Sequence, residues 1–325
     1  MSSLRELWFT GRRAVEVRLG SPAVLEEGQV RVRALASGIS QGTELLLFGG
    51  EGPAQFDPSL DAPGAPTYPR RYGYAWVGQV AESRALAWSP GSRVFGLLAH
   101  GDEHCVSASA LRTLPESVPA ERAILAANLE TAINVVWDGG VALGDDVLVI
   151  GGGIVGLLCG FVARLSGAAT VRLLEPAQRR REAALKLGFD VAVAPSDAAS
   201  LAQADVVIEA SGRPECLSLA IPRARQEGVV VVASFYGQRV APLALGDEFH
   251  RRRLTLRSSQ VSHLPPHQSA RWSYARRFEL VSRLLADARL DMLLEPPVAF
   301  DEAPALYGRL AQSPAELLQC SFHYR

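Results

Sequence analysis

Residues 151–156 read Gly-Gly-Gly-Ile-Val-Gly, a match to the pattern G-x-G-x-x-G that lies between an apolar run and a segment with helical spacing. In such a motif Gly151 permits a tight turn, Gly153 lets the backbone approach a bound group, and Gly156 allows close packing of helix and strand. A glycine turn without a ligand is the alternative. Because a strand pattern precedes the motif and a helix pattern follows it, we predict that it holds the pyrophosphate of a dinucleotide.

An acidic residue is expected about 20 positions after this motif, where it binds the ribose hydroxyls at the end of the next strand. Glu175 ends the segment VRLLE and occupies that position. Because its carboxylate repels a 2′-phosphate, we expect NAD(H) to be favoured over NADP(H). Arg180 lies in a run of three arginines nearby and could accept the phosphate, which leaves NADP(H) open. The N–H groups of Ile154 and Val155 are expected at the phosphates.

Two further segments follow strand patterns and are expected beside the same cofactor, because the carboxyl ends of parallel strands line the ligand crevice. The residues concerned are Ala210, Ser211 and Gly212 after DVVIE, and Ser234, Phe235 and Tyr236 at the end of the strand-like segment GVVVVASFYG. The last three are expected near the nicotinamide. Packing in the core is the alternative for Tyr236 and the favoured interpretation for Phe235.

Strand and helix patterns alternate from residue 121 to residue 263. Short apolar runs such as VLVI and DVVIE are typical of parallel strands buried on both faces. They alternate with helix patterns such as IVGLLCGFVARL and AQRRREAALKLG, and Gly188 stands where a helix C-terminus favours a left-handed residue. The alternation predicts an α/β fold with a doubly wound parallel sheet, in a dinucleotide-binding domain that spans 121–263.

The first third of the chain has a different pattern. Segments 15–19 and 30–38 alternate apolar and polar residues, as half-buried strands do, and glycine and proline are frequent between them. We therefore predict a β-rich domain over residues 1–120. The segment 264–325 resembles this domain more than the middle of the chain, so we expect it to return there.

Composition narrows the classes of protein that the chain could be. With 325 residues it is long enough for two domains, and its net charge of −1 argues against a nucleic-acid-binding protein. No apolar run approaches the ~18 residues that span a membrane, and the first residues do not read as a signal peptide. The four cysteines form no CxxC pair. We therefore expect a cytoplasmic protein with reduced thiols and a small-molecule substrate.

Three segments carry a resemblance to a known family. ALASGISQGTE (34–44), YGYAWVGQV (72–80) and AANLETAIN (126–134) resemble the segments around the catalytic zinc ligands of the medium-chain dehydrogenase/reductase superfamily, the relatives of zinc alcohol dehydrogenases. The resemblance runs over the whole chain. It implies a GroES-like catalytic domain, a Rossmann domain, hydride transfer between a nicotinamide and a small-molecule alcohol or ketone at the cleft between the domains, and a homodimer that joins the edges of the dinucleotide sheets.

The same segments depart from the family at each zinc ligand. The cysteine position falls on Ser40 or Gln41, the histidine position on Tyr74, and the third position on Ala127 or Asn128. A catalytic zinc needs three protein ligands, which these residue types do not supply. The resemblance is therefore to a branch without the zinc ligands, similar to the bacteriochlorophyllide a dehydrogenases, and we expect no zinc.

Without zinc, hydrogen-bond donors must stabilise the charge that develops on the reacting oxygen. Tyr74 is the first candidate, because a phenol with an ordinary pKa of ~10 is protonated at neutral pH. The alternative is that the tyrosine ring only fills the space that the zinc ion occupies in the family. The resemblance places Thr43 at the family's hydroxyl proton relay, while Ser40 and Gln41 stand at the former cysteine position.

His104 is a weaker candidate for a proton relay. With His100 it forms HxxxH, a spacing that could bind a metal on a helix, although the stretch precedes a strand-like segment. His250 and residues 258–260 could line a substrate pocket or a subunit contact, and the loop 49–69 could form a pocket wall. None of these features identifies the substrate.

Two other functions stay open. A zinc-less relative could reduce a conjugated C=C bond as an enoyl or quinone reductase, with Tyr74 steadying an enolate oxygen. Alternatively, the chain could bind NAD(H) without turnover, because loss of all three zinc ligands is compatible with a sensor or a pathway subunit.

Overall fold

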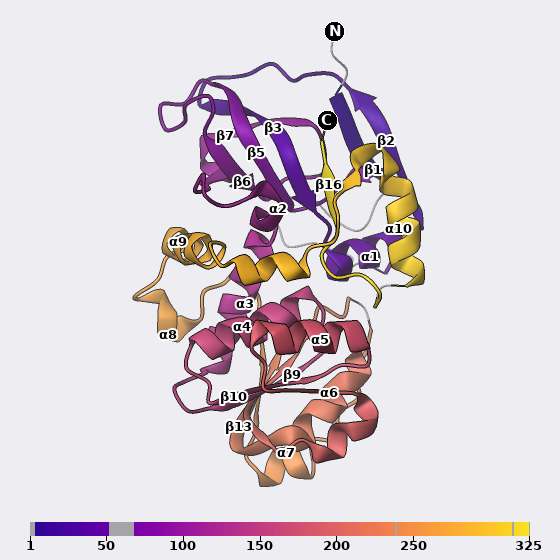
Figure 1. The fold of residues 1–325 in the computed structure, drawn as a ribbon, viewed down its shortest axis with the longest axis vertical. Helices are drawn as coiled ribbons and strands as arrows, with labels where there is room; N and C mark the ends of the chain where they lie inside the picture. Colours follow the sequence, from indigo (N-terminus) through magenta and orange to yellow (C-terminus); the bar gives the residue numbers. More distant parts are fainter. Residues whose placement is uncertain (1–3, 52–67, 238, 314, 325) are drawn as a thin grey trace. The chain divides into compact units, whose positions relative to one another are not determined.

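The computed structural model describes residues 4–51, 68–237, 239–313 and 315–324. Its contacts divide the chain into two compact units: unit 1 is Met1–Ala127 with Phe278–Arg325, and unit 2 is Asn128–Arg277. The predicted α/β class is confirmed, with a parallel sheet in unit 2 and a β-rich unit 1 (Figure 1). The functional domain boundaries predicted at 120/121 and 263/264 stay a prediction.

Unit 2 is built on a six-stranded sheet in which every neighbouring pair is parallel. In sheet order the strands are β11 (Val191–Val193), β10 (Thr170–Leu174), β9 (Asp146–Ile150), β12 (Ala204–Glu209), β13 (Ala224–Val232) and β14 (Thr255–Ser258). The central strands are rich in valine, leucine and isoleucine because helices cover both faces of such a sheet. The chain order reverses between β9 and β12, and the glycine motif follows β9 at this switch point, where open parallel sheets bind ligands.

The helices that accompany this sheet are α3 (Ala126–Gly139), α4 (Ile154–Leu165), α5 (Gln178–Leu187), α6 (Pro214–Ala220), α7 (Glu248–Arg251) and α8 (Pro266–Ser269), with 3-10 segments η3 (Pro195–Ser200) and η4 (Ile221–Arg223). Helix α5 ends as predicted, because Gly188 adopts a φ of 99°, a left-handed conformation that glycine reaches without strain. Strand β14 is an edge strand of the sheet, and the homodimer through this edge stays a prediction.

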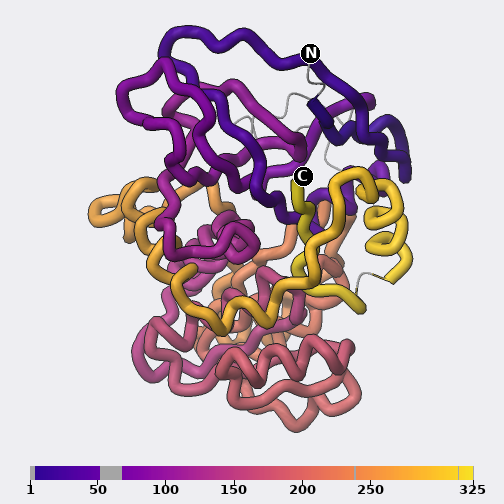
Figure 2. The backbone as a smooth tube through the Cα atoms, turned by 45° about the horizontal axis from the view of Figure 1, so that its top comes forward, coloured from indigo at the N-terminus to yellow at the C-terminus, as the bar shows by residue number. Residues whose placement is uncertain are grey.

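Unit 1 contains a seven-stranded sheet and a separate three-stranded sheet. The first joins β15 (Val298–Ala299), β16 (Ser321–His323), β3 (Gln29–Gly38), β5 (Ala75–Ser83), β6 (Arg93–Gly96) and β8 (Leu111–Thr113), with β7 (Glu103–Ser107) paired to β3; the second joins β2 (Ala14–Gly20), β1 (Leu4–Gly11) and β4 (Arg70–Arg71). Because β16 pairs antiparallel with β3, the C-terminal segment lies beside a strand from the first forty residues (Figure 2).

The helices of this part of the chain are α1 (Gln41–Gly49), α2 (Ala120–Ala123), α9 (Tyr274–Leu284) and α10 (Ala303–Gln312), with 3-10 segments η2 (Ala108–Ala110), η5 (Ala288–Leu293) and η6 (Phe300–Glu302). One core cluster of this unit includes Phe9, Tyr307 and Phe322, all 0% exposed. Within the described ranges, no helix is both long enough and apolar enough to cross a membrane.

Candidate functional site

Helix α1 begins shortly after the end of β3, and a reciprocal pair of hydrogen bonds caps its N-terminus. Ser40 is its N-cap residue, and the Oγ of Ser40 accepts from the N–H of Thr43 at 3.4 Å. In return, Oε1 of Glu44 accepts from the N–H of Ser40 at 2.8 Å. A serine N-cap with a glutamate in the first turn resembles a capping box, in which side chains satisfy the first N–H groups of the helix. The cap therefore holds the hydroxyl of Ser40 in place.

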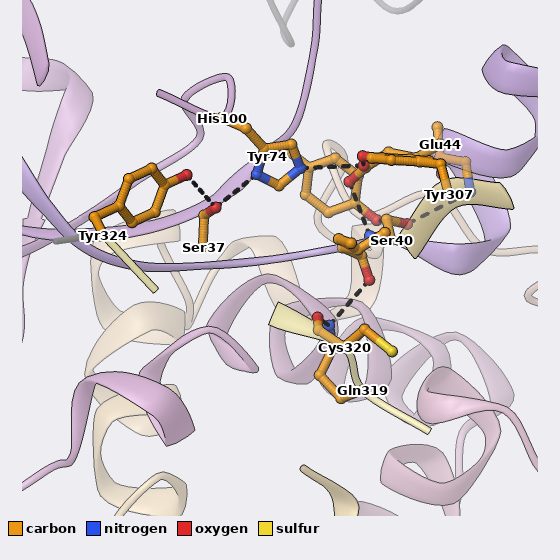
Figure 3. A network of polar contacts seen from close by, with 11 residues as sticks. Ser37, Ser40, Glu44, Tyr74, His100, Tyr307, Gln319, Cys320 and Tyr324 are labelled. Atoms are coloured by element: carbon orange, nitrogen blue, oxygen red, sulfur yellow. Dashed lines mark hydrogen bonds and ion pairs between the residues drawn. The ribbon is translucent and has the colours of Figure 1, made fainter. Parts of the chain in front are cut away.

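Tyr74, the residue before β5, points its hydroxyl at this cap. The hydroxyl donates to Oγ of Ser40, and both residues are labelled in Figure 3. The side chain of Thr43 also lies within hydrogen-bond reach of this hydroxyl. Burial is the largest effect on the pKa of Tyr74 and raises it above the usual 10; the charge of Glu44 also raises it, while Ser40 and Thr43 oppose the shift. Tyr74 is therefore a protonated donor at neutral pH, in a partly buried cluster of three hydroxyls.

Behind this cluster lies a fully buried carboxylate–imidazole pair. Nε2 of His100 lies 3.1 Å from Oε2 of Glu44, and both side chains are 0% exposed. The same carboxylate oxygen accepts from the hydroxyl of Tyr307 on α10. On the other side of the ring, the Oγ of Ser37 lies 2.6 Å from Nδ1 of His100 and 2.6 Å from the hydroxyl of Tyr324. Figure 3 shows this line of side chains from Tyr324 to Glu44.

The sequence patterns did not predict the residues that bind the His100–Glu44 pair. Ser37, Tyr307 and Tyr324 carry no motif, and His100 was considered only as a metal partner of His104. One usable signal was present, since a serine four positions before Glu44 and just ahead of an apolar run is typical of a helix start. The hydrogen bonds that join the other residues cross between β3, α10 and the C-terminal strand, which no local pattern encodes.

Gly73 is required where it stands, because its φ of 127° is strained for other residues and a Cβ there would lie 2.7 Å from Cδ2 of His100. We expect Gly73→Ala to lower the free energy of unfolding by about 1–3 kcal/mol through backbone strain, with the collision added. Gly28→Ala is the matched control, since Gly28 has a φ of 75° but nothing within 4 Å of a Cβ. Urea unfolding that gives equal losses for the two variants would contradict the close packing of His100 on Gly73.

Two predicted catalytic residues lie apart from the hydroxyl cluster. Nε2 of Gln41 donates to the backbone oxygens of Leu317 at 3.2 Å and Leu318 at 2.5 Å, so this side chain ties α1 to the C-terminal segment. His104 lies within β7 instead of ahead of a strand, and its Nε2 lies 2.9 Å from the carbonyl oxygen of Ala99. Burial first, and then the nearby Arg71, lower the pKa of His104 to about 3, so the ring is neutral at physiological pH.

The residues at the family's zinc positions do not fit a zinc ion. The hydroxyls of Ser40 and Tyr74 already share a hydrogen bond, Ala127 offers no side-chain donor atom, and Asn128 would add only an amide. Catalytic zinc sites use thiolate, imidazole and carboxylate ligands. Across the part of the chain that the structure describes, no three His, Cys, Asp or Glu side chains gather in a way that could hold a metal ion.

The glycine motif of unit 2 has the geometry that its sequence predicts. Gly151 has a φ of 102°, and a Cβ there would lie 2.5 Å from the Cα of Ser211 on the neighbouring strand end. A Cβ on Gly156 would lie 1.9 Å from the carbonyl oxygen of Gly151, so this glycine is needed for the helix to meet the strand. Gly153, the N-cap residue of α4, has nothing within 4 Å of a Cβ. The N-terminus of α4 therefore has open space beside Gly153, and the next two residues, Ile154 and Val155, are half-buried.

Glu175 and Arg180 both lie beside this motif. Oε2 of Glu175 accepts from the N–H of Gly152 at 2.6 Å and Oε1 accepts from the N–H of Ala177 at 2.8 Å, which holds the buried carboxylate at the end of β10. A Cβ on Gly152 would lie 3.3 Å from Cβ of Arg180. Burial lowers the pKa of Arg180, although Glu175 opposes this shift. A carboxylate and a guanidinium side chain therefore both lie at this end of the sheet.

The other predicted cofactor neighbours follow β12 and β13. Ala210, Ser211 and Gly212 come directly after β12, and Gly212 donates its N–H to the Oγ of Ser234 at 2.8 Å. Strand β13 ends at Val232, so Ser234, Phe235 and Tyr236 follow the strand instead of ending it. The prediction that Phe235 packs in the core is wrong, since its side chain is 50% exposed. Tyr236 packs on a core cluster, and its hydroxyl donates to Oε2 of Glu209 at 2.5 Å.

The remaining candidates have other partners. The Oγ of Ser259 donates to Oδ2 of Asp138 at 2.7 Å, and the carbonyl of Gln260 accepts from Nδ2 of Asn134 at 3.3 Å, so the segment after β14 is tied to α3. Ser258 ends β14, and His250 is exposed on α7. Most of the loop 49–69 lies outside the described residues.

Comparison with known proteins points to one family. Residues 155–278 match a family model described as zinc-binding dehydrogenase. D-guloside 3-dehydrogenase of Escherichia coli (strain K12) is 27% identical over 208 residues, which cover 61% of this chain and 59% of that protein. L-threonine 3-dehydrogenase of Pyrococcus abyssi (strain GE5 / Orsay) is 33% identical over 136 residues, 39% of each chain. This chain therefore matches less than two thirds of the length of these relatives.

The fold is similar over a longer stretch than the sequence. The crystal structure of 2R,3R-butanediol dehydrogenase from Bacillus subtilis superposes with a TM-score of 0.83 at 19% identity, covering 99% of this chain and 100% of that one. At this identity the likeness concerns the fold. It includes both the parallel sheet that carries the glycine motif and the β-rich unit that carries Tyr74.

Proposed function

We propose that this chain, which belongs to the medium-chain dehydrogenase/reductase superfamily, transfers a hydride between a nicotinamide dinucleotide and a small-molecule alcohol or ketone. The observation that carries the proposal is the open N-terminus of α4 behind a glycine turn at the switch point of a parallel sheet. Such a helix start binds the pyrophosphate of a dinucleotide. The named activities of the relatives support a substrate with a hydroxyl group.

In this proposal the chain's own residues handle the substrate oxygen and its proton. A bound nicotinamide accepts or donates the hydride. When substrate is bound, the O–H of Tyr74 turns from Oγ of Ser40 to the oxygen of the reacting alkoxide or carbonyl, where it stabilises negative charge as an oxyanion donor does. Ser40 and Thr43 hold that hydroxyl by hydrogen bonds, and the cap of α1 holds Ser40. The mechanism uses no zinc, because the residues at the zinc positions supply no suitable ligand set.

For the cofactor we propose NAD(H) before NADP(H). The carboxylate of Glu175 is held at the end of β10 by two backbone N–H groups, where it would accept the ribose hydroxyls and repel a 2′-phosphate. Arg180 supports the opposite choice, because a guanidinium beside the same ribose would pair with that phosphate. A mixed preference is the outcome that would follow if both side chains contact the ribose.

The proposal is tested by an assay of purified, chelator-treated protein with secondary alcohols and polyols, in the presence of NAD⁺ or NADP⁺. We expect turnover with NAD⁺ that neither chelation nor added zinc changes, because the reacting oxygen binds hydroxyl donors instead of a metal. Metal analysis of the same sample supplies the control. Stoichiometric zinc in active protein would overturn the zinc-independent mechanism.

The same assay separates the other functions. Oxidation of NADH with enones or enoyl thioesters, but not with ketones, would assign the chain to C=C reduction, in which Tyr74 steadies an enolate oxygen. Tight NADH binding without turnover on any carbonyl, alcohol or alkene would assign it to cofactor binding alone.

A further inference from the structure

Glu44 is a fully buried carboxylate in the first turn of α1, and the groups around it are donors. Its Oε1 accepts from the N–H of Ser40 at 2.8 Å, and its Oε2 accepts from the hydroxyl of Tyr307. The imidazole of His100 presents Nε2 to the same oxygen at 3.1 Å. An ionised carboxylate is acceptor-only, so this shell satisfies the charged form, provided that Nε2 of His100 carries a proton.

The other side of His100 decides where that proton sits. Tyr324 is protonated, since burial raises its pKa, and within the described residues the Oγ of Ser37, at 2.6 Å, is the acceptor that its O–H reaches. With the proton of Tyr324 on Oγ of Ser37, the arrangement we infer has Ser37 donating its own proton to Nδ1 of His100, 2.6 Å away. The ring proton is then left on Nε2, which donates to Glu44.

The ring of His100 is also fixed in orientation. It is 0% exposed, its edge lies against Gly73, and it meets Phe322 at 5.2 Å between ring centroids. The hydrogen bonds thus run in one direction from Tyr324 through Ser37 and His100 to Glu44. They bring together two ends of the chain, because Ser37 lies on β3 and Tyr324 follows β16.

We infer that Tyr324, Ser37 and His100 are positioning residues that hold an ionised Glu44 behind the hydroxyls of Ser40 and Tyr74. The inference rests on the proposed function, in which Tyr74 donates to the substrate oxygen. Glu44 acts on this donor in two ways. Its Oε1 anchors the backbone of Ser40, the acceptor for Tyr74, and its charge adds to burial in keeping the phenol protonated.

The direction of the chain of hydrogen bonds is tested without any activity. In protein labelled with ¹⁵N-histidine, the signals of His100 are assigned by their loss in His100→Gln. We expect a neutral ring with the proton on Nε2 and an unprotonated Nδ1. A proton on Nδ1, whether in the other tautomer or in an imidazolium, would overturn the inference.

The positioning role is tested by Ser37→Ala, which removes the donor to Nδ1. We expect kcat to fall about tenfold, the size of one lost buried hydrogen bond, with the dissociation constant of NADH unchanged. Ser83→Ala is the matched control, because Ser83 ends β5 of the same sheet and its hydroxyl, among the described residues, bonds locally to the backbone of Ala85. Equal kcat values for the two variants would overturn the role.

Tyr324→Phe keeps the inference testable if Ser37→Ala does not fold. It removes the group that orients Ser37, so we expect a smaller fall in kcat and a mixed tautomer signal for His100. An unchanged tautomer signal with unchanged kcat would contradict the inference. If the wild-type protein turns over no alcohol or ketone, the proposed function fails, while the ¹⁵N spectrum still decides the state of the His100–Glu44 pair.

Discussion

Tyr74→Phe is expected to lower turnover by about 10²–10³-fold while the dissociation constant of NADH stays the same, which is the size of effect for removal of one oxyanion donor. The hydroxyl of Tyr74 donates to Ser40 and lies within reach of Thr43, in a cluster of three partly buried side chains. The ring packs against the core whether or not the hydroxyl is present. Steady-state kinetics and NADH titration of the variant measure the two quantities separately.

The neighbouring Tyr72 offers a matched control. Its ring packs edge-on against Tyr74 at 6.4 Å between centroids, and it belongs to the buried core cluster. Tyr72→Phe removes a hydroxyl from the same stretch of chain, and we expect turnover near that of the wild type. Ser40→Ala in combination with Tyr74→Phe should add little to the single tyrosine change, because the two hydroxyls act as one unit. A Tyr74→Phe variant with full turnover would mean that the ring only packs.

The pH dependence of this donor has a definite sign. Burial raises the pKa of Tyr74 above its ordinary value of 10, so the phenol carries its proton throughout the neutral range. The donor is lost only when the pH rises through that raised pKa. Loss of turnover that depends on Tyr74 is therefore expected on the alkaline side, above pH ~10.

Gly153→Asp is expected to weaken NADH binding by about 100-fold or more and to leave the fold intact. Gly153 has a φ of −69°, which any residue adopts, and nothing lies within 4 Å of a Cβ there. Aspartate is also a favoured N-cap residue, so it should support the start of α4. The cost appears only when a pyrophosphate arrives, because two like charges about 4 Å apart repel by roughly 4 kcal/mol at an effective dielectric constant of 20.

Two further variants separate charge, bulk and folding. Gly153→Asn has nearly the same shape as aspartate without the charge, and we expect it to lose much less affinity. Gly156→Ala should lose both stability and NADH binding, since its Cβ would lie 1.9 Å from the carbonyl oxygen of Gly151. Calorimetric titration with NADH and thermal unfolding measure these outcomes. A folded Gly153→Asp variant that binds NADH normally would mean that the dinucleotide binds elsewhere.

Much of unit 2 was predictable because its signals are local. The buried parallel strands are continuous apolar runs, and the turn after β9 needs its glycines for reasons of backbone geometry alone. The error in this unit concerns the burial of one side chain. The apolar strand before Phe235 favours a core position, yet Phe235 lies after the end of β13 and is 50% exposed. An apolar sequence pattern can continue beyond the last hydrogen-bonded residue of a strand, so residue type alone does not show where the strand ends.

The candidate site of unit 1 was predictable only in part. Tyr74, Ser40 and Thr43 were named from their place in a family pattern, and the structure brings their hydroxyls together. Helix α1 was missed, since a nine-residue helix with a glycine at its second position shows little helical periodicity. His104 was preferred to His100 as the working histidine, but its imidazole faces the carbonyl of Ala99 and Arg71.

The sequence by itself determined the order of a β-rich segment and a strand–helix segment and the position of the glycine turn, because each depends on residue types close together in the chain. Only the tertiary structure decided which residues form the hydrogen-bonded network next to Tyr74. Ser37 meets His100 across 63 positions, and it meets Tyr324 across 287 positions through the pairing of β16 with β3. Hydrogen bonds depend on distance in space, and a fully buried carboxylate and imidazole become partners only when the fold has brought helix α1 and the segment between β6 and β7 together.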